Sequence, residues 1–340
     1  YEIYQCDWSS DVCSSDLGVD LSARQVAMGQ ARIEVLGLRN ITVRQGDVAD
    51  PDLVSGEFDY IVCHGLFSWV PRPVQDAVLA LCGRHLAPGG IFYCSYNVLP
   101  GWRQRGVIRD VFRRHTPEGA SPLDRVARGR WLLDRLAEAS NAATPYGQLL
   151  RHEAQQLARM PDSYIVGEFL SDANEALYFS EFAARARAAG LAYLADTDLH
   201  SARVAAGDAE AQRLVEALAG QDADMAEQYL DLFQGRQFRQ SRLVRAESVG
   251  PVRPAMEARR LAPLHFSSRL RMERAADGQA MVLRDPAGPS ITTNDPAFAR
   301  AMEALGQCWP ETRSLRELLD LPGVADGADR NAVAERLLQS

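Results

Sequence analysis

The sequence contains no lysine, since arginine supplies all 37 of its Lys and Arg residues. A chain without lysine cannot carry a P-loop lysine or a lysine that forms a Schiff base. It also has no strongly basic run, and its formal net charge is −8. Because binding to phosphate backbones needs clustered positive charge, we expect no nucleic-acid partner.

Long apolar runs and metal-binding cysteine patterns are missing as well. No run reaches the roughly 18–20 apolar residues of a membrane span. The six cysteines form no CxxC pair and have no His–Cys spacing typical of metal sites, so we expect no metal. Cys63, Cys82 and Cys94 lie in apolar periodic segments, which predicts reduced thiols in a core. These features predict a cytoplasmic globular protein.

The first 17 residues differ from the rest of the chain. They have neither helical nor strand periodicity, and the part from Cys6 to Leu17 is rich in Asp and Ser. The basic start and apolar centre of a signal peptide are missing. The segment resembles the translation of a sequencing-library adaptor. We therefore expect residues 1–17 to be non-native and the natural sequence to resume at Gly18.

From Gly18 onward, short apolar strands alternate with amphipathic helices. The first helix is predicted to begin after Ser22, with Gln25 completing a capping box, and to end at Gly37. Strands are expected at 18–21, 40–45, 58–63 and 91–96, and a further helix at 74–86. This order predicts an α/β protein with a doubly wound, parallel, Rossmann-like sheet.

Three of these strands end in polar residues, namely Asp20, Asp47 and His64. The carboxyl ends of parallel strands meet at one edge of the sheet, where ligands bind. An acid after such a strand often accepts from ribose hydroxyls, and Asp47 with the apolar Val48 suits an adenine. Each Asp alone is more simply a turn or a helix cap. Together they predict a nucleoside-type cofactor.

The loops after the third and fourth strands supply the candidate substrate pocket. Trp69 follows His64 in one loop, and Tyr96, Asn97 and Trp102 follow the last strand at the same edge. They could shape an acceptor pocket. Alternatively, Tyr96 and Trp102 form an apolar lid on the sheet and Asn97 forms a turn.

Four segments in this order resemble class I S-adenosylmethionine-dependent methyltransferases. They are GVDLS, GDV, FDYIVCHGLFSWVP and LAPGGIFYCSYNVLPGW. More narrowly, they resemble the bacterial group with a methyltransferase regulatory domain, which includes protein-lysine methyltransferases of outer-membrane proteins. EFLSDANEALYFSEFAARARAAGLAYLAD and EQYLDLFQGRQFRQSRLVR are similar to that regulatory domain. The resemblance covers roughly residues 18–245.

The resemblance implies S-adenosylmethionine as cofactor, with the ribose at Asp20 and the adenine at Asp47 and Val48. Leu21, Cys63 and His64 belong to the same implied cofactor site. His64 is also the candidate catalytic residue, since a neutral imidazole can accept a proton from an amine or hydroxyl. The family's first strand and glycine-rich loop should precede Gly18, where the adaptor-like segment stands. Two alternatives stay open: a non-catalytic, methyltransferase-like assembly module, and an NAD-dependent oxidoreductase.

The implied domains are a methyltransferase core at 18–102, a helical regulatory insertion with the closing helix and hairpin at 103–246, and a small α+β domain at 250–340. Within the insertion, His152 and Glu153 are predicted to be a surface pair. The last domain is expected to be winged-helix-like, with strands at 264–272 and 280–283 and a role in recognition or contact between two copies. The methyl acceptor, protein or small molecule, is not readable from the sequence.

Overall fold

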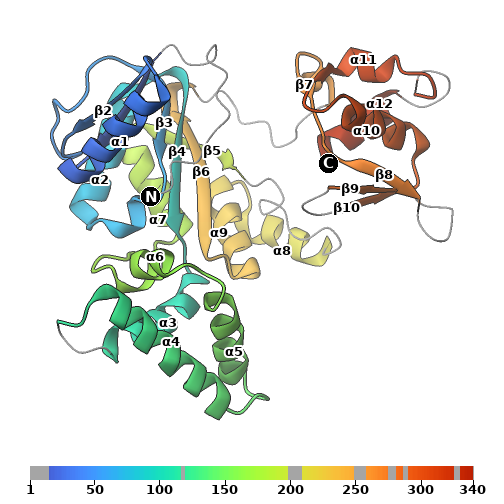
Figure 1. Ribbon diagram of the computed structural model, residues 1–340. Coiled ribbons are helices and arrows are strands. Elements are labelled where there is room, and N and C mark those ends of the chain that lie inside the picture. Colours follow the sequence, from blue (N-terminus) through green and yellow to red (C-terminus); the bar gives the residue numbers. More distant parts are fainter. Residues whose placement is uncertain are drawn as a thin grey trace. The chain divides into compact units, whose positions relative to one another are not determined.

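The computed structural model describes residues 15–115, 119–197, 209–248, 258–274, 281–285, 290–324 and 330–339. The chain divides into two compact units, residues 1–250 and residues 251–340, and each is described by itself. Figure 1 shows the elements of both units along the chain. The predictions of a non-native segment and a missing glycine-rich loop lie largely outside the described residues, which begin at Ser15.

The helices and strands of the first unit are, in chain order, β1 (Asp16–Asp20), α1 (Ala23–Leu36), β2 (Ile41–Gln45), β3 (Phe58–Cys63), η1 (Phe67–Trp69), α2 (Arg72–His85), β4 (Leu86–Asn97), α3 (Trp102–Arg114), α4 (Pro122–Ala139), α5 (Pro145–Leu157), α6 (Asp162–Ile165), η2 (Val166–Leu170), α7 (Phe179–Ala188), β5 (Leu191–Asp196), α8 (Ala209–Ala219), α9 (Ala223–Gln234), β6 (Phe238–Arg245) and η3 (Ala246–Ser248). This order follows the alternation predicted from the sequence. The first strand begins at Asp16, two residues earlier than expected.

The first layer consists of β1, α1 and β2, with the two strands parallel. Ser22 caps α1 by accepting from the Gln25 amide, and Gly37 ends the helix with a left-handed φ of 65°. The second bond of the predicted capping box, from the Ser22 amide to the Gln25 side chain, is replaced by another bond. The amide of Ser22 donates to Asp20 Oδ1 at 2.7 Å. A carboxylate from the preceding strand thus has the role expected of the Gln25 side chain.

The main sheet has the strand order β3-β4-β6-β5. β3 and β4 are parallel, whereas β6 runs antiparallel to both of its neighbours, as the predicted closing hairpin requires. Helices α2 and α7 bury the core face of this sheet, where Phe92, Phe182 and Leu243 are fully enclosed. Cys63, Cys82 and Cys94 are buried free thiols, as predicted.

In the part of the first unit that the structure describes, the strands form two separate ladders, β1-β2 and β3-β4-β6-β5. On β3, Tyr60 and Val62 have 66% and 68% of their surface exposed. Their alternation with the half-buried Ile61 places them on the face opposite the core. The sheet is therefore well covered on one face and open on the other near β3.

Helices α3, α4, α5 and α6 with η2 form a helical layer between β4 and α7 in the chain, below the sheet in Figure 1. Pro122 and Pro145 begin α4 and α5, where a missing N–H costs nothing. The layer has its own core, which includes Phe112, Leu133 and Phe169. The sequence predicted this helical stretch.

The second unit is a small α+β body. Its elements are η4 (Ala258–Leu261), β7 (His265–Phe266), β8 (Arg271–Arg274), β9 (Met281–Arg284), β10 (Ser290–Thr293), α10 (Pro296–Cys308), β11 (Arg313–Ser314), α11 (Leu315–Leu319) and α12 (Arg330–Gln339). The strands β8, β9 and β10 form an antiparallel sheet. The predicted strand at 264–272 is wrong, because the chain leaves the extended pairing at Ser267 and resumes it at Arg271.

Candidate functional site

Asp20 and Asp47 lie next to each other at the carboxyl end of the β1-β2 ladder. The amide of Gly46 donates to the Asp20 carbonyl at 3.1 Å, which joins the two strand ends. One carboxylate oxygen of Asp20 accepts from Ser22, and one of Asp47 accepts from the Ala49 amide at 2.9 Å. The second oxygen of each acid has no hydrogen-bond partner among the described residues. Each acid therefore keeps one free acceptor.

The neighbours of these acids differ in exposure. Val48 is half-buried against the main core, whereas Leu21 has 68% of its surface exposed. A Cβ at Gly46 would lie 2.2 Å from Leu53 Cδ1, so a larger residue here would make the Leu53 side chain move.

His64 follows β3 and is held by a tyrosine from the neighbouring strand. His64 Nδ1 lies 3.0 Å from the Tyr93 hydroxyl, and the Gly65 amide donates to Ser95 Oγ at 3.0 Å. Gly65 turns the chain here with a φ of 65°. Burial raises the pKa of the Tyr93 phenol, which the bond with Ser95 partly opposes. Cys63 precedes His64 but is 7% exposed, with its thiol in the core.

Trp69, Asn97 and Trp102, three of the predicted pocket residues, meet around one segment of the helical layer. Trp69 Nε1 donates to the Gly167 carbonyl at 2.9 Å. Trp102 Nε1 and Asn97 Nδ2 both donate to Asn174 Oδ1, at 2.9 and 3.4 Å. Hydrogen bonds thus connect the loops after β3 and β4 to residues 167–174.

Ser68 reinforces this junction, although it is not among the predicted site residues. Its hydroxyl accepts from the Asn97 amide, and its carbonyl accepts from the Glu175 amide, each at 2.8 Å. Ser68 is completely buried. Asn174 was also missed, because only the folded chain brings it next to Trp102, which lies 72 positions away in sequence.

Tyr96 does not join the other predicted pocket residues. It is fully buried, stacks on Phe182 with ring centroids 4.1 Å apart, and its hydroxyl bonds to Ser241 at 3.0 Å. Because side chains alternate along a strand, Tyr96 shares the core face of β4 with Phe92 and Cys94. The alternative given above, an apolar role for Tyr96 on the sheet, describes its position better.

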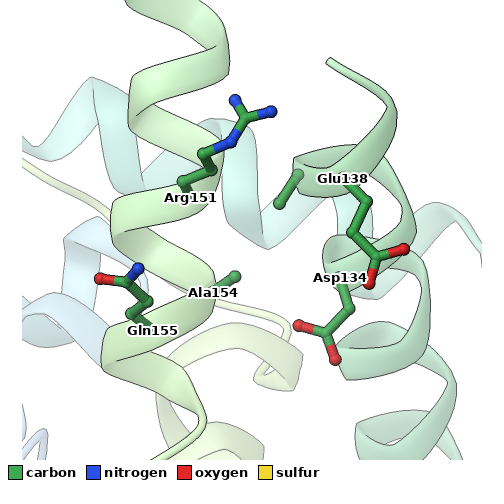
Figure 2. A pocket seen from close by; sticks show the side chains of 6 residues that line it. Asp134, Glu138, Arg151, Ala154 and Gln155 are labelled. Atoms are coloured by element: carbon green, nitrogen blue, oxygen red, sulfur yellow. The ribbon is translucent and has the colours of Figure 1, made fainter. Parts of the chain in front are cut away.

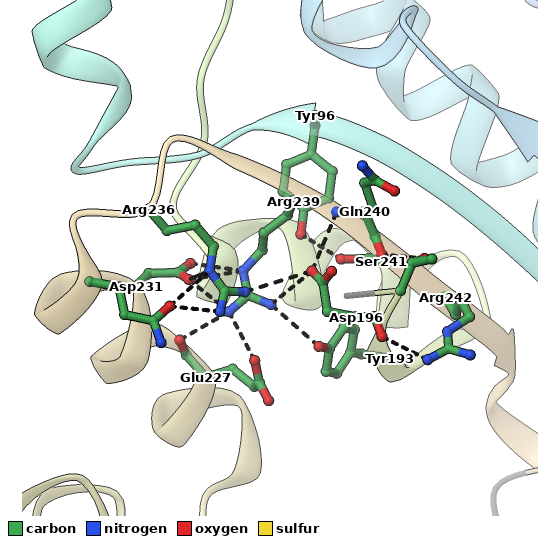
Figure 3. A network of polar contacts seen from close by, with 12 residues as sticks. Tyr96, Tyr193, Asp196, Glu227, Asp231, Arg236, Arg239, Gln240, Ser241 and Arg242 are labelled. Atoms are coloured by element: carbon green, nitrogen blue, oxygen red, sulfur yellow. Dashed lines mark hydrogen bonds and ion pairs between the residues drawn. The ribbon is translucent and has the colours of Figure 1, made fainter. Parts of the chain in front are cut away.

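A buried ion network lies beside Tyr96 and is shown in Figure 3. The Arg239 guanidinium has no exposed surface and donates to Asp231 at 2.8 Å and to Glu227 at 2.9 Å. It also lies 4.2 Å from the ring centre of Phe179. Burial raises the pKa of the Asp231 carboxyl, although the bonds from Arg239 oppose that shift. The network joins α9 to β6 and α7, so we assign it a structural role.

A pocket of about 190 Å³ lies apart from the predicted residues, between α4 and α5. Figure 2 shows Asp134 and Glu138 on one helix and Arg151 on the other. No group of three or more His, Cys, Asp or Glu side chains that could hold a metal occurs in the described ranges. Within the same ranges, no helix is long and apolar enough to cross a membrane.

Two family models match the chain. One, described as a methyltransferase domain, matches residues 9–90, and the other, a predicted methyltransferase regulatory domain, matches residues 161–245. Two uncharacterized proteins of Rickettsia prowazekii are each 37% identical to it. The match with RP028 extends over 175 residues, which are 51% of this chain and 70% of RP028. The match with RP789 extends over 224 residues, which are 66% of this chain and 40% of RP789.

Solved structures agree with these matches. The structure of PKMT2 from Rickettsia typhi has a TM-score of 0.80 and 26% identity, and covers 96% of this chain. The structure of PKMT2 in complex with AdoHcy gives a TM-score of 0.81. The chain spans 64% of PKMT2 and two fifths of RP789. Two family models match the chain, the alignment with RP028 covers more than two thirds of that relative, and the fold matches that of PKMT2. The chain therefore belongs to the S-adenosylmethionine-dependent methyltransferases that carry a methyltransferase regulatory domain.

Proposed function

We propose that this chain binds S-adenosylmethionine and transfers its methyl group to a lysine side chain of a protein. The observation that carries the proposal is the pair of acids at the end of the β1-β2 ladder. Asp20 and Asp47 are joined through Gly46, and each keeps one free carboxylate oxygen. These oxygens are suited to accept from ribose hydroxyls and from the exocyclic amine of adenine.

The remaining residues fit the same cofactor. Val48, half-buried beside Asp47, offers an apolar surface for the adenine ring. His64 is exposed, contacts the Tyr93 hydroxyl and directly follows β3, at the end of the strand where the reacting end would lie. When bound, the cofactor supplies an electrophilic sulfonium methyl group. The protein then has to orient the acceptor, exclude water and remove a proton from the acceptor amine.

The methyl acceptor that we propose is the amine of a lysine side chain. The resemblance to protein-lysine methyltransferases of outer-membrane proteins, and the likeness to PKMT2, support a lysine amine. Half-buried Trp69 offers an aromatic surface next to the strand ends, and the buried Asn97 and Trp102 support it from behind through Asn174. Such a surface suits an extended peptide that presents a long alkyl amine.

A non-catalytic assembly module is the second candidate, and one observation favours it. In the described residues no strand joins β1 to β3, so the two halves of the cofactor site lie on separate ladders. The family assignment argues against the third alternative, an NAD-dependent oxidoreductase. Binding of S-adenosylhomocysteine separates the first two candidates, because an assembly module has no need of it.

The test has two steps, both with the full chain. Isothermal titration with S-adenosylhomocysteine should give saturable binding that Asp20→Asn and Asp47→Asn each weaken about tenfold, the value of one lost charge-assisted hydrogen bond. Methyl-labelled cofactor is then incubated with outer-membrane protein fragments and with the same fragments after lysine acetylation. Label confined to the unacetylated fragments is expected. Equal label in both sets would exclude lysine, and absent binding would favour the assembly module.

A further inference from the structure

Glu168 lies in η2, a single π-helical turn that the predicted pocket residues hold in place. The turn is fixed on both sides of Glu168. Trp69 Nε1 donates to the Gly167 carbonyl at 2.9 Å, and Asn174 Nδ2 donates to the Glu168 carbonyl at 3.1 Å. Asn174 in turn accepts from Trp102. Single π-turns are rare and frequent at functional sites. Glu168 is thus attached to the loops that follow β3 and β4.

The carboxylate of Glu168 has cations near it but no hydrogen bond. No donor reaches it in the portion of the chain that is described, and the side chain is half-buried. Arg105 and Arg109 act on it electrostatically and lie on the α3 face that begins with Trp102. Both are engaged elsewhere. Arg105 donates to Glu153 at 2.9 Å, and Arg109 donates to the carbonyl of Phe169 at 2.9 Å.

The other elements packed against η2 add little charge. From α6, Tyr164 lies near the carboxyl, and burial raises the pKa of its phenol. From α4, Val126 and Leu133 contribute apolar surface, and Arg130 is paired with Asp162 at 3.0 Å. Beyond η2, Asp172 pairs with Arg113 at 3.4 Å. Burial therefore dominates, and it raises the pKa of Glu168 to about 7 in spite of Arg105 and Arg109.

This environment matches a requirement of the proposed reaction. A lysine amine has an ordinary pKa of about 10.4, so it is an ammonium near neutral pH and has no lone pair for attack. A base that titrates near the working pH removes such a proton most effectively. Half-buried carboxylates without donors are also the groups that gain most from a bound ammonium.

We propose that Glu168 binds the acceptor's primary ammonium and takes its proton before methyl transfer, an inference that rests on the proposed function. The N–H bond breaks, its electron pair stays on nitrogen, and the proton forms an O–H bond on the Glu168 carboxylate. The neutral amine then attacks the methyl carbon as the carbon–sulfur bond breaks, and the sulfur keeps that electron pair. Asn174 and Trp69 act as positioning residues for the turn.

The first experiment reads the carboxyl directly and does not depend on turnover. The full chain is labelled with [¹³C-carboxyl]glutamate and titrated by NMR, with Glu168→Gln used to assign the resonance. A carboxyl that titrates near pH 7 is expected, and saturating n-butylammonium, a mimic of the lysine side chain, should lower its midpoint. Matched sodium chloride should not do so. A midpoint that n-butylammonium leaves unchanged overturns the proposal.

The second experiment uses methyl transfer to a lysine peptide, with Glu210→Gln as the control because Glu210 is exposed and lies in α8, outside the helical layer. In the wild type, kcat should rise as pH increases through about 7. Glu168→Gln should lose this inflection and fall by about 10²–10⁴-fold, the usual contribution of a general base. Glu168→Asp should keep the inflection at a lower rate.

The two experiments separate this inference from the proposed function. If the wild type transfers no methyl group but n-butylammonium still shifts the Glu168 midpoint, the proposed function fails while ammonium binding stands. If the wild type methylates lysine and Glu168→Gln keeps both its rate and its pH profile, the proposed function stands and the assignment of Glu168 is wrong.

Discussion

Trp69 Nε1 donates to the carbonyl of Gly167 at 2.9 Å, a contact between residues 98 positions apart in sequence. Together with the bond from Trp102 to Asn174, it connects the sheet edge to the helical layer at two points. The layer therefore forms one wall of the candidate site. The segment 167–174 of this layer therefore belongs to the acceptor pocket that we propose.

Asn174 is the centre of this junction, and its replacement should loosen it. Asn174→Ala leaves the buried Trp102 indole without an acceptor and the Glu168 carbonyl without a donor. Each unsatisfied group costs about 1–3 kcal/mol, so we expect the two to lower the free energy of unfolding by about 2–6 kcal/mol. Urea denaturation of the wild type and of Asn174→Ala measures this difference in the free energy of unfolding. Asn294→Ala, at an exposed position, is the control, and equal stability of the two variants would contradict the prediction.

His64 should affect turnover more than cofactor affinity. Its ring is exposed and is held by the Tyr93 hydroxyl at 3.0 Å, whereas the acids that would hold the nucleoside lie on another ladder. We expect His64→Ala to lower kcat for methyl transfer at least about tenfold, within the range of a lost proton-transfer group. The dissociation constant for S-adenosylhomocysteine, measured by titration, should change less than about twofold.

Tyr93→Phe provides the companion measurement for His64. It removes the hydroxyl that orients the imidazole and keeps the ring. A smaller loss of kcat than in His64→Ala is expected, again with little change in cofactor affinity. Unchanged kcat in a correctly folded His64→Ala would exclude a direct role for His64.

The strands and helices that place the site could be predicted from local patterns. Alternation and caps are local, so Ser22, Gly37, Pro122 and Pro145 mark element ends in the sequence as in the structure. The same alternation could have shown that Tyr96 belongs to the core face of β4 and that Tyr93 faces the other way.

The errors elsewhere come from contacts distant in sequence. Glu153 was predicted to be a surface residue because it is charged and next to His152, yet it is 4% exposed and paired with Arg105. That partner lies 48 positions away. Glu168 likewise gains its environment from α3 and α6, and no local pattern marks it. The candidate base therefore becomes visible only when the helical layer is packed.

Gly101 tests the close packing where the chain leaves β4. A Cβ there would lie 1.9 Å from the Gly235 carbonyl oxygen, which is backbone and cannot turn aside. Gly101→Ala should therefore lower the free energy of unfolding by about 3 kcal/mol, through forced backbone shifts. Gly106→Ala is the matched control, since nothing lies within 4 Å of its Cβ position inside α3.

The control substitution, Gly106→Ala, should instead raise the free energy of unfolding. Alanine is favoured over glycine inside a helix by about 1 kcal/mol, so Gly106→Ala should stabilise the protein slightly. Thermal and urea unfolding of the two variants, compared with the wild type, measure both effects. A Gly101→Ala variant as stable as Gly106→Ala would show that the β4–α3 junction adapts more easily than the structure indicates.

The raised pKa of Glu168 also predicts how the free energy of unfolding depends on pH. Its pKa rises from the ordinary 4.5 to about 7 on folding, chiefly through burial. The folded state therefore holds this proton more tightly than the unfolded state, and the stabilising contribution is complete below pH 4.5. It is lost as pH rises toward 7, because ionisation then charges a half-buried group. The side chain of Glu168→Gln is neutral at every pH, so this variant should not lose stability as pH rises toward 7.

Urea midpoints of the wild type and of Glu168→Gln, measured at intervals between pH 4.5 and pH 8, test this relation. The two proteins should be equally stable at the acid end, apart from a constant offset. Their difference should then grow in favour of Glu168→Gln and level off above about pH 7. Parallel curves across the whole range would mean that Glu168 ionises at its ordinary pKa, so the burial of its carboxyl could not supply a base near neutral pH.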